Sequence, residues 1–179
     1  MIRNPNDIQE GAKKIRMLIA GYPGIGKSTL ALSAPNPLHI DVDFGIDRIE
    51  PRYRKPYIQP QSYDEILGDL TPINLQDFDT LVFDTGGKLI SLMSLWAIKK
   101  DPKYGQRDGS LSLKGYGFVG KEFVRLMDYC FYELQKNIVI VVPRHGGKGR
   151  RQHPPPHQGR GPDEKQRLGA YGPGRLRGK

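Results

Sequence analysis

The glycine-rich stretch Gly21–Ser28 carries the clearest chemistry in the sequence and reads Gly-Tyr-Pro-Gly-Ile-Gly-Lys-Ser. It fits the pattern G-x-x-x-x-G-K-[ST], in which glycines let the backbone turn sharply and aim successive N–H groups into one concavity. Such a concavity binds phosphates, the lysine reaches the terminal ones, and the following hydroxyl is a ligand for Mg²⁺. The flanking runs, residues 15–20 and 29–34, favour the strand and helix that this motif requires, and the helix N-terminus adds partial positive charge. The stretch predicts a nucleotide site formed by Gly21, Tyr22, Pro23, Gly24, Ile25, Gly26, Lys27, Ser28 and Thr29.

Aspartates end two further strand-like segments. In residues 80–85 three apolar residues run into Asp84, which predicts a buried strand whose carboxylate holds Mg²⁺ together with Ser28. The alternative for Asp84 is a helix cap. Residues 38–43 alternate in polarity and include Asp41 and Asp43, which places carboxylates at the carboxyl end of a strand, where open α/β sheets bind ligands.

The remaining elements of the first 142 residues alternate between strand and helix. We expect a short edge strand at 57–59, a helix over 63–70, an apolar helix over 89–98, a helix over 118–135 and a buried strand over 137–142. Ser62, with Glu65 three residues later, gives the helix over 63–70 a capping box. This alternation predicts an α/β fold with a parallel sheet flanked by helices.

Cys130 is the only cysteine, so the chain has no internal disulfide and a reducing compartment is expected. We interpret Cys130 as a small buried residue on a helix. The sequence shows neither a signal peptide nor an apolar run long enough to span a membrane. We therefore expect no membrane partner and a cytoplasmic location, in a bacterium or a phage-infected host cell.

Residues 99–117 are rich in lysine, glycine and aspartate and lack periodicity, so a long loop is expected there. Basic and aromatic side chains together suit single-stranded nucleic acid, through phosphate contacts and base stacking. The candidate contacts are Lys103, Arg107, Lys114 and Tyr116. The alternative is a solvated loop with no ligand.

The positive charge of the chain is concentrated at its C-terminal end. Residues 143–179 contain ten Lys or Arg and two Asp or Glu, whereas residues 1–142 contain 18 and 17. The same 37 residues contain nine glycines and six prolines, a composition that cannot bury enough apolar surface to order itself. We therefore expect two parts, a core over 1–142 and a disordered basic tail over 143–179.

The genetic code offers a second interpretation of this tail. Residues 143–148 can be encoded so that removal of one nucleotide yields His-Ala-Met-Glu-Glu-Lys, a polar residue followed by an acidic loop. The hypothesis is a one-nucleotide frameshift near codon 143 that replaces the native C-terminal third. The nucleotide sequence of the gene tests it, because the other frame must then contain an α/β-like continuation.

Together, residues 21–29, 40–45, 81–85 and 118–142 resemble the phage-type RecA-like P-loop ATPases, an AAA-like group that includes proteins similar to phage single-strand annealing ATPases. The resemblance implies a RecA-like sheet that binds ATP and Mg²⁺ at the carboxyl ends of its strands. It implies that Lys27 stabilises the transferring phosphate, that Ser28 and Asp84 hold Mg²⁺, and that Asp43 polarises the attacking water, with Asp41 as the fallback. The polar sensor residue expected after the last strand is replaced by Pro143 and Arg144, and later strands are missing, so the fold is expected to be incomplete at its C-terminus.

The leading hypothesis is a P-loop ATPase that acts in phage DNA recombination or replication, with single-stranded DNA as partner and assembly into a homo-oligomer. One alternative is a small-molecule or nucleotide kinase, although such kinases usually carry clustered arginines in a lid and residues 99–117 contain Arg107 alone. The other is a non-enzymatic, basic nucleic-acid-binding protein whose affinity lies in residues 143–179.

Overall fold

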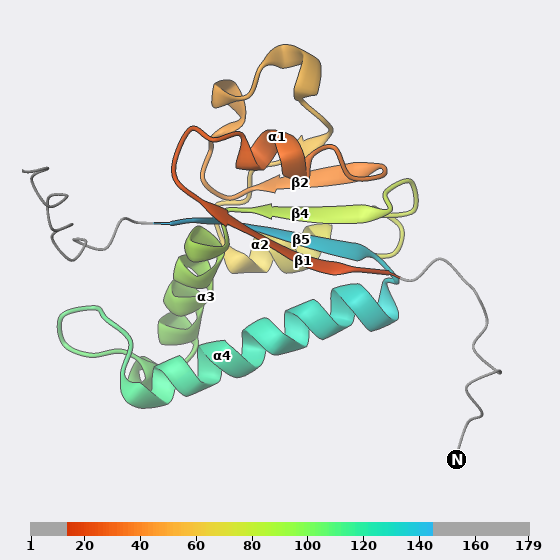
Figure 1. Cartoon of the computed structure of the whole chain (residues 1–179). Coiled ribbons are helices and arrows are strands. Elements are labelled where there is room, and N and C mark those ends of the chain that lie inside the picture. The colour runs from red at the N-terminus through yellow and green to blue at the C-terminus, as the bar shows by residue number, and fades with distance from the viewer. Residues whose placement is uncertain (1–13, 145–179) are drawn as a thin grey trace, which may run out of the picture. The chain divides into compact units, whose positions relative to one another are not determined.

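The computed structural model describes residues 14–144, which form a five-stranded parallel sheet flanked by helices (Figure 1). The strands are β1 (Arg16–Gly21), β2 (Pro37–Asp41), β3 (Tyr57–Ile58), β4 (Thr80–Asp84) and β5 (Asn137–Pro143), in the spatial order β1-β5-β4-β2-β3. The helices are α1 (Lys27–Ala31), α2 (Tyr63–Asp69), α3 (Gly86–Lys100) and α4 (Leu113–Asp128). The predicted α/β class and parallel sheet are confirmed.

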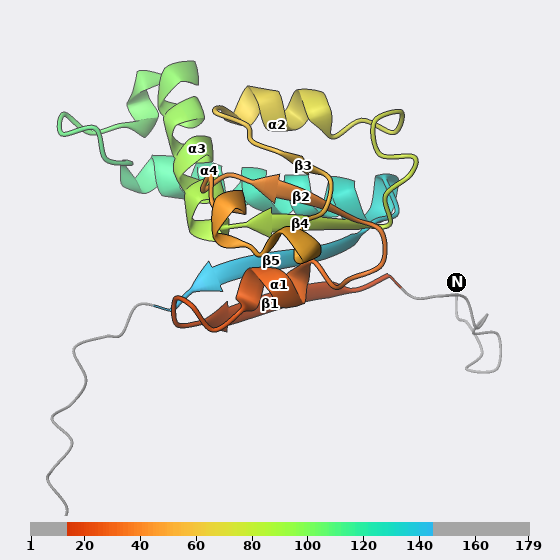
Figure 2. The same ribbon diagram turned by 90° about the horizontal axis from the view of Figure 1, so that it is seen from above.

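The inner strands β2, β4 and β5 bury one set of side chains on the face of α1 and the alternate set under the other helices, which lie on the opposite face (Figure 2). In β4, Val82 packs in the cluster that contains Ala31 of α1, whereas Leu81 and Phe83 pack in the larger cluster with α2, α3 and α4. This alternation follows from the two-residue period of a strand. It also places every second residue near the carboxyl ends of β2 and β4 on the face of α1.

Within residues 14–144, β1 is an edge strand that pairs with β5 alone. Its residues Met17 and Leu18 are 46% and 64% exposed, although the sequence of β1 is apolar enough for a buried strand. No helix in this part of the chain is both long and apolar enough to cross a membrane.

The structure confirms the capping box and changes several boundaries. Ser62 Oγ accepts a hydrogen bond from the backbone N–H of Glu65 (3.2 Å), and the Glu65 carboxylate accepts one from the N–H of Gln61 (2.8 Å). The prediction of a helix over 29–34 was wrong in extent, because α1 begins at Lys27 and ends at Ala31. The helix expected over 118–135 begins five residues earlier, at Leu113, and α4 passes into a π-helical turn over Tyr129–Glu133.

The long loop expected over 99–117 was also wrong in extent. Helix α3 continues to Lys100, a 3₁₀ turn covers Pro102–Tyr104, and Ser112 caps α4 by accepting a hydrogen bond from the Gly115 N–H (3.1 Å). The rings of Tyr104 and Phe118 stack with centroids 4.4 Å apart, which fastens the 3₁₀ turn to α4. Lys114 and Tyr116 therefore belong to the first turn of α4 rather than to a loop.

We expect Gly115→Ala to destabilise the fold by about 1–3 kcal/mol, because a Cβ at this buried position would overlap the carbonyl oxygen of Tyr104. Gly117 lies in the same helix, and a methyl group added there would meet no atom within 4 Å, so Gly117→Ala is the matched control. It should be stabilising by about 0.5–1 kcal/mol through the lower entropy of the unfolded chain. Urea unfolding of both variants measures the difference, and equal midpoints would contradict the close contact at Gly115.

Cys130 is fully buried in the π-helical turn, and burial raises the pKa of its thiol to about 12. The thiolate is the reactive form, so we expect Cys130 to resist alkylation at pH 8 in the native protein and to react at the rate of a free thiol in urea. Mass spectrometry after timed exposure to iodoacetamide measures both rates. Rapid labelling of the folded chain would contradict this burial.

Candidate functional site

The loop between β1 and α1 is curled tightly by two glycines in the left-handed region, Gly24 (φ 81°) and Gly26 (φ 83°). Other residues adopt this conformation only with strain, which explains the glycines at these two positions of the motif. Gly26 is also the N-cap of α1. Because α1 has only five residues, its dipole is small, and anion binding at this loop would depend on the loop amides and side chains rather than on the helix.

Lys27 and Ser28 open the first turn of α1, directly after the curled loop. The Lys27 ammonium donates a hydrogen bond to the carbonyl oxygen of Tyr22 (2.8 Å), so the loop holds the cation against its own backbone. Both residues line the same cavity as Gly24 and Gly26. The arrangement combines a charge, a hydroxyl and backbone donors within one turn, as phosphate binding requires.

Asp84 reaches this loop from a strand that is not adjacent to β1. Strand β5 lies between them, with Val141 paired to Ile19 on one side and to Asp84 on the other. At about 4.8 Å per strand the separation of β1 and β4 is roughly 10 Å. A loop that projects from β1 and a carboxylate that ends β4 can therefore face each other across the end of β5.

The carboxyl group of Asp84 is almost buried, with 7% of the residue exposed. Burial raises the pKa of this group, but the neighbouring polar side chains of His39 and Ser28, together with the charge of Lys27, outweigh it and hold the pKa below its ordinary value. Asp84 is therefore ionised at neutral pH. The pairing of this carboxylate with the Ser28 hydroxyl fits Mg²⁺, which binds through one or two protein oxygens and keeps several waters.

A cavity of about 690 Å³ unites the candidate residues, a volume within the range of small-molecule sites. Of the nine loop residues predicted from the sequence, the cavity is lined by Pro23, Gly24, Gly26, Lys27, Ser28 and Thr29. Gly21, Tyr22 and Ile25 are not among its lining residues. The cavity is also lined by Asp41, Asp43 and Asp84, so the predicted acidic residues and the loop meet in one place.

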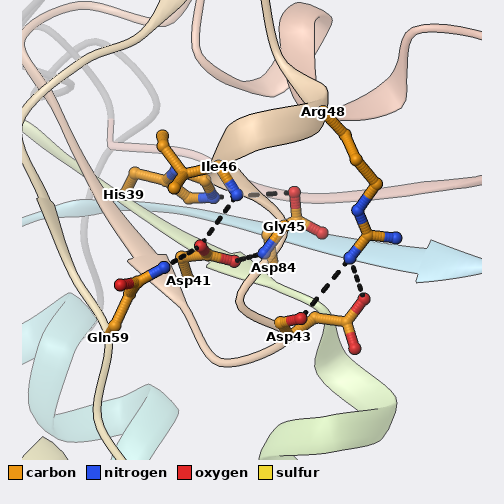
Figure 3. Close-up of polar contacts among 8 residues, drawn as sticks. All are labelled: His39, Asp41, Asp43, Gly45, Ile46, Arg48, Gln59 and Asp84. Carbon is orange, nitrogen blue, oxygen red and sulfur yellow. Dashed lines mark hydrogen bonds and ion pairs between the residues drawn. The ribbon is translucent and has the colours of Figure 1, made fainter.

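The two aspartates near the end of β2 have different surroundings (Figure 3). The carboxylate of Asp41, 1% exposed, accepts hydrogen bonds from the N–H groups of Gly45 (2.8 Å) and Ile46 (3.0 Å) and from Gln59 Nε2 (2.9 Å). Its oxygens are therefore occupied in holding the turn that follows β2. Asp43 is partly exposed and makes an ion pair with Arg48 (3.0 Å), which leaves it the more available of the two.

Three residues of the site had no role in the sequence-based prediction. Arg48 and Lys88 line the cavity, and His39 contacts Asp84 from β2. The sequence could have predicted that Lys88 lies near the site, because Lys88 is two residues after Gly86, which opens α3 at the carboxyl end of β4. His39 lies two residues before Asp41 in the same strand, so the sequence already indicated that both side chains share one face of the sheet. Arg48 lies in a 3₁₀ turn and has no comparable signal.

The end of β5 lies beside the loop. The backbone N–H of Arg144 donates to the carbonyl oxygen of Gly21 (2.8 Å), and its guanidinium lies 5.8 Å from the centre of the Tyr22 ring. Pro143 lines the cavity at the place where a polar sensor residue was expected, and it belongs to β5 rather than to the tail. The proposed tail beyond this point, including the frameshifted segment, lies outside the described residues from 145 onward.

The four candidate nucleic-acid contacts lie away from the cavity. They follow the C-terminal end of α3, whose 15 residues span about 22 Å from Gly86, next to the cavity-lining Thr85, to Lys100. The Lys114 ammonium lies 5.9 Å from the centre of the Tyr104 ring. All four candidate side chains are exposed: Lys103, Arg107, Lys114 and Tyr116.

Comparison with known families agrees with this geometry. A family model described as an AAA domain matches residues 13–148, which is most of the chain and includes every described element. The search of curated proteins gives no match.

Proposed function

Because the chain belongs to the AAA domain family, whose members bind nucleotides, we propose that it binds ATP with Mg²⁺ and hydrolyses it. The observation that carries the proposal is the common cavity in which Lys27 and Ser28 face Asp43 and Asp84. A curled glycine loop, one ammonium, one hydroxyl and an ionised carboxylate form the set that nucleoside triphosphate hydrolysis requires.

Each residue has a distinct part in this proposal. The loop amides and Lys27 hold the β- and γ-phosphates and stabilise the charge that spreads over the transferring phosphoryl group. Ser28 and Asp84 hold Mg²⁺, which when bound supplies positive charge to the phosphate oxygens. Asp43 orients the attacking water, since it borders the cavity and Asp41 is committed to the turn after β2.

For Asp43 to act on water, its carboxylate must leave Arg48. Both side chains are substantially exposed, 44% for Asp43 and 70% for Arg48, and an ion pair of this kind contributes only about 0–1 kcal/mol. Separating Asp43 from Arg48 therefore costs little free energy. Arg48 also lines the cavity, so the same guanidinium is placed to contact phosphate once Asp43 has moved.

The proposed setting is phage DNA recombination or replication, with single-stranded DNA as the partner and assembly into a homo-oligomer. The exposed basic and aromatic side chains after α3 support the DNA contact, because phosphates pair with cations and bases stack on rings. Helix α3 links this surface to the cavity, since it begins next to Asp84 and ends next to Lys103. The exposed, unpaired edge of β1 in the described chain supports association with further copies.

The test measures ATP binding and phosphate release by the full chain, with and without Mg²⁺ and with and without single-stranded DNA. We expect Mg²⁺-dependent turnover that single-stranded DNA increases several-fold and duplex DNA increases less. The double variant Lys103→Glu/Arg107→Glu should lose the DNA effect and keep basal turnover. Lys55→Glu, an exposed charge reversal in another loop, is the matched control.

Several outcomes would overturn parts of this proposal. Failure to bind ATP in the presence of Mg²⁺ would refute the ATPase assignment altogether. Turnover that is indifferent to DNA would remove the DNA role alone, and transfer of the γ-phosphate to a small acceptor would identify a kinase instead. DNA binding without ATP binding would favour the non-enzymatic alternative.

A further inference from the structure

His39 is the one residue in the described chain with buried side-chain nitrogens that lack a hydrogen-bond partner. It lies in β2 with 0% of its surface exposed. Both Nδ1 and Nε2 are buried and lack a hydrogen-bond partner. Burying an imidazole without a partner costs free energy, since its hydrogen bonds to water are lost and not replaced. A leucine or phenylalanine would fill the same space without this cost. The histidine at this position therefore calls for a role beyond packing.

The strand register places His39 on the same face of the sheet as Asp84. His39 pairs with Val82 and Asp41 pairs with Asp84 in the β2–β4 ladder, so all four side chains lie on the face of α1. His39 Nε2 lies 3.6 Å from Asp84 Oδ2, and the imidazole points at this carboxylate in Figure 3. The distance is a few tenths of an ångström longer than a good N–H···O hydrogen bond. A small shift of either side chain closes it.

We propose that His39 is a positioning residue for Asp84, with its Nε2–H directed at Oδ2 so that the remaining carboxylate oxygen faces the Mg²⁺ site. This inference rests on the proposed function and deepens it. A hydrogen-bonded partner fixes the orientation of a metal-binding carboxylate, and loss of such a partner typically weakens metal affinity about 10–100-fold. Ser28 lines the same cavity as Asp84 from the loop side, so His39 in β2 and Ser28 in α1 lie near the carboxylate from two different elements. The proposal requires only that Nε2 carries hydrogen, which is true of one neutral tautomer and of the cation.

The experiment is calorimetric titration of the full chain with ATP, once in Mg²⁺ and once in EDTA. The quantity of interest is the ratio of the two dissociation constants, which is the gain in affinity that Mg²⁺ provides. We expect His39→Leu, which fills the space without a donor, to lower this ratio about 10-fold or more and to leave ATP affinity in EDTA unchanged. We expect His39→Gln to keep the ratio within about 3-fold of the wild-type value, because its amide nitrogen reaches a position close to that of Nε2.

His39→Asn provides a second comparison if the leucine variant does not fold. The asparagine side chain is shorter than that of glutamine, and its amide nitrogen does not reach Asp84, so the ratio should drop as it does for leucine. If His39 had only a packing role, the asparagine and glutamine variants should behave alike. An unchanged ratio in folded His39→Leu, or in folded His39→Asn, would overturn the positioning role while leaving the ATPase proposal intact. A wild-type chain that binds no ATP would overturn the proposed function and this inference with it.

Discussion

Lys27→Ala is expected to lower the affinity for MgATP and the rate of phosphate release at least ~100-fold, or about 2.7 kcal/mol. The physical reason is that Lys27 opens α1 directly after the curled loop and lines the cavity, where we propose that its charge stabilises the phosphates. Alanine is the best helix former, so the first turn of α1 should be retained. Calorimetry with ATP and a phosphate-release assay measure the two effects.

The fold of the Lys27→Ala variant should remain intact, because the substitution removes one hydrogen bond to the Tyr22 carbonyl and no core contact. Thermal unfolding within a few degrees of the wild type would show this. Lys55→Ala is the matched control, since Lys55 is exposed and does not line the cavity. Wild-type ATP affinity in folded Lys27→Ala would end the assignment of the loop as a phosphate site.

Asp84→Asn should abolish most Mg²⁺-dependent turnover, with a fall of at least ~100-fold at millimolar Mg²⁺. The amide keeps the shape of the carboxylate but removes the negative charge that the nearby side chains of His39, Ser28 and Lys27 stabilise. ATP binding in EDTA should change little, because the loop contacts do not involve Asp84. Phosphate release measured across a Mg²⁺ titration separates lost metal affinity from lost catalysis.

The exposed residue Asp77 provides the control for this experiment, since Asp77→Asn removes the same charge outside the cavity. It should leave both the Mg²⁺ dependence and the maximal rate unchanged. If Asp84→Asn reached the wild-type rate at the wild-type Mg²⁺ concentration, the carboxylate at the end of β4 would not hold the metal.

The parts of the site that the sequence predicted are those encoded by local, contiguous signals. The phosphate loop has fixed spacing, and the left-handed conformations at Gly24 and Gly26 are the reason for its glycines. Strand β4 is a short apolar run that ends in a carboxylate, and β5 is a continuous β-branched run. In each case the residues that define the element also determine its environment, so one stretch of sequence was sufficient to predict the element.

Features that depend on tertiary contacts were missed or misplaced. The start of α4 was obscured by Gly115 and Gly117, whose low helix propensity is overcome by the Ser112 cap and by stacking of Tyr104 on Phe118. The roles of Asp41 and Asp43 could not be separated from the pattern, because the distinction depends on how the turn after β2 folds back to donate N–H groups to Asp41 and on Gln59, 18 residues away from Asp41. The environment of His39 likewise depends on the register between β2 and β4.

Strand β5, which lies between β1 and β4, sets the distance across the candidate site. The gap between the lysine side and the carboxylate side of the cavity equals two steps of the sheet, so backbone hydrogen bonding sets it rather than flexible side chains. Val141 stands midway in this gap, 1% exposed, and it also lines the cavity. For the Mg²⁺ and phosphates that we propose to bind here, the pleated main chain therefore sets the distance between the groups that would hold them. A larger side chain at position 141 would narrow the cavity without changing that distance.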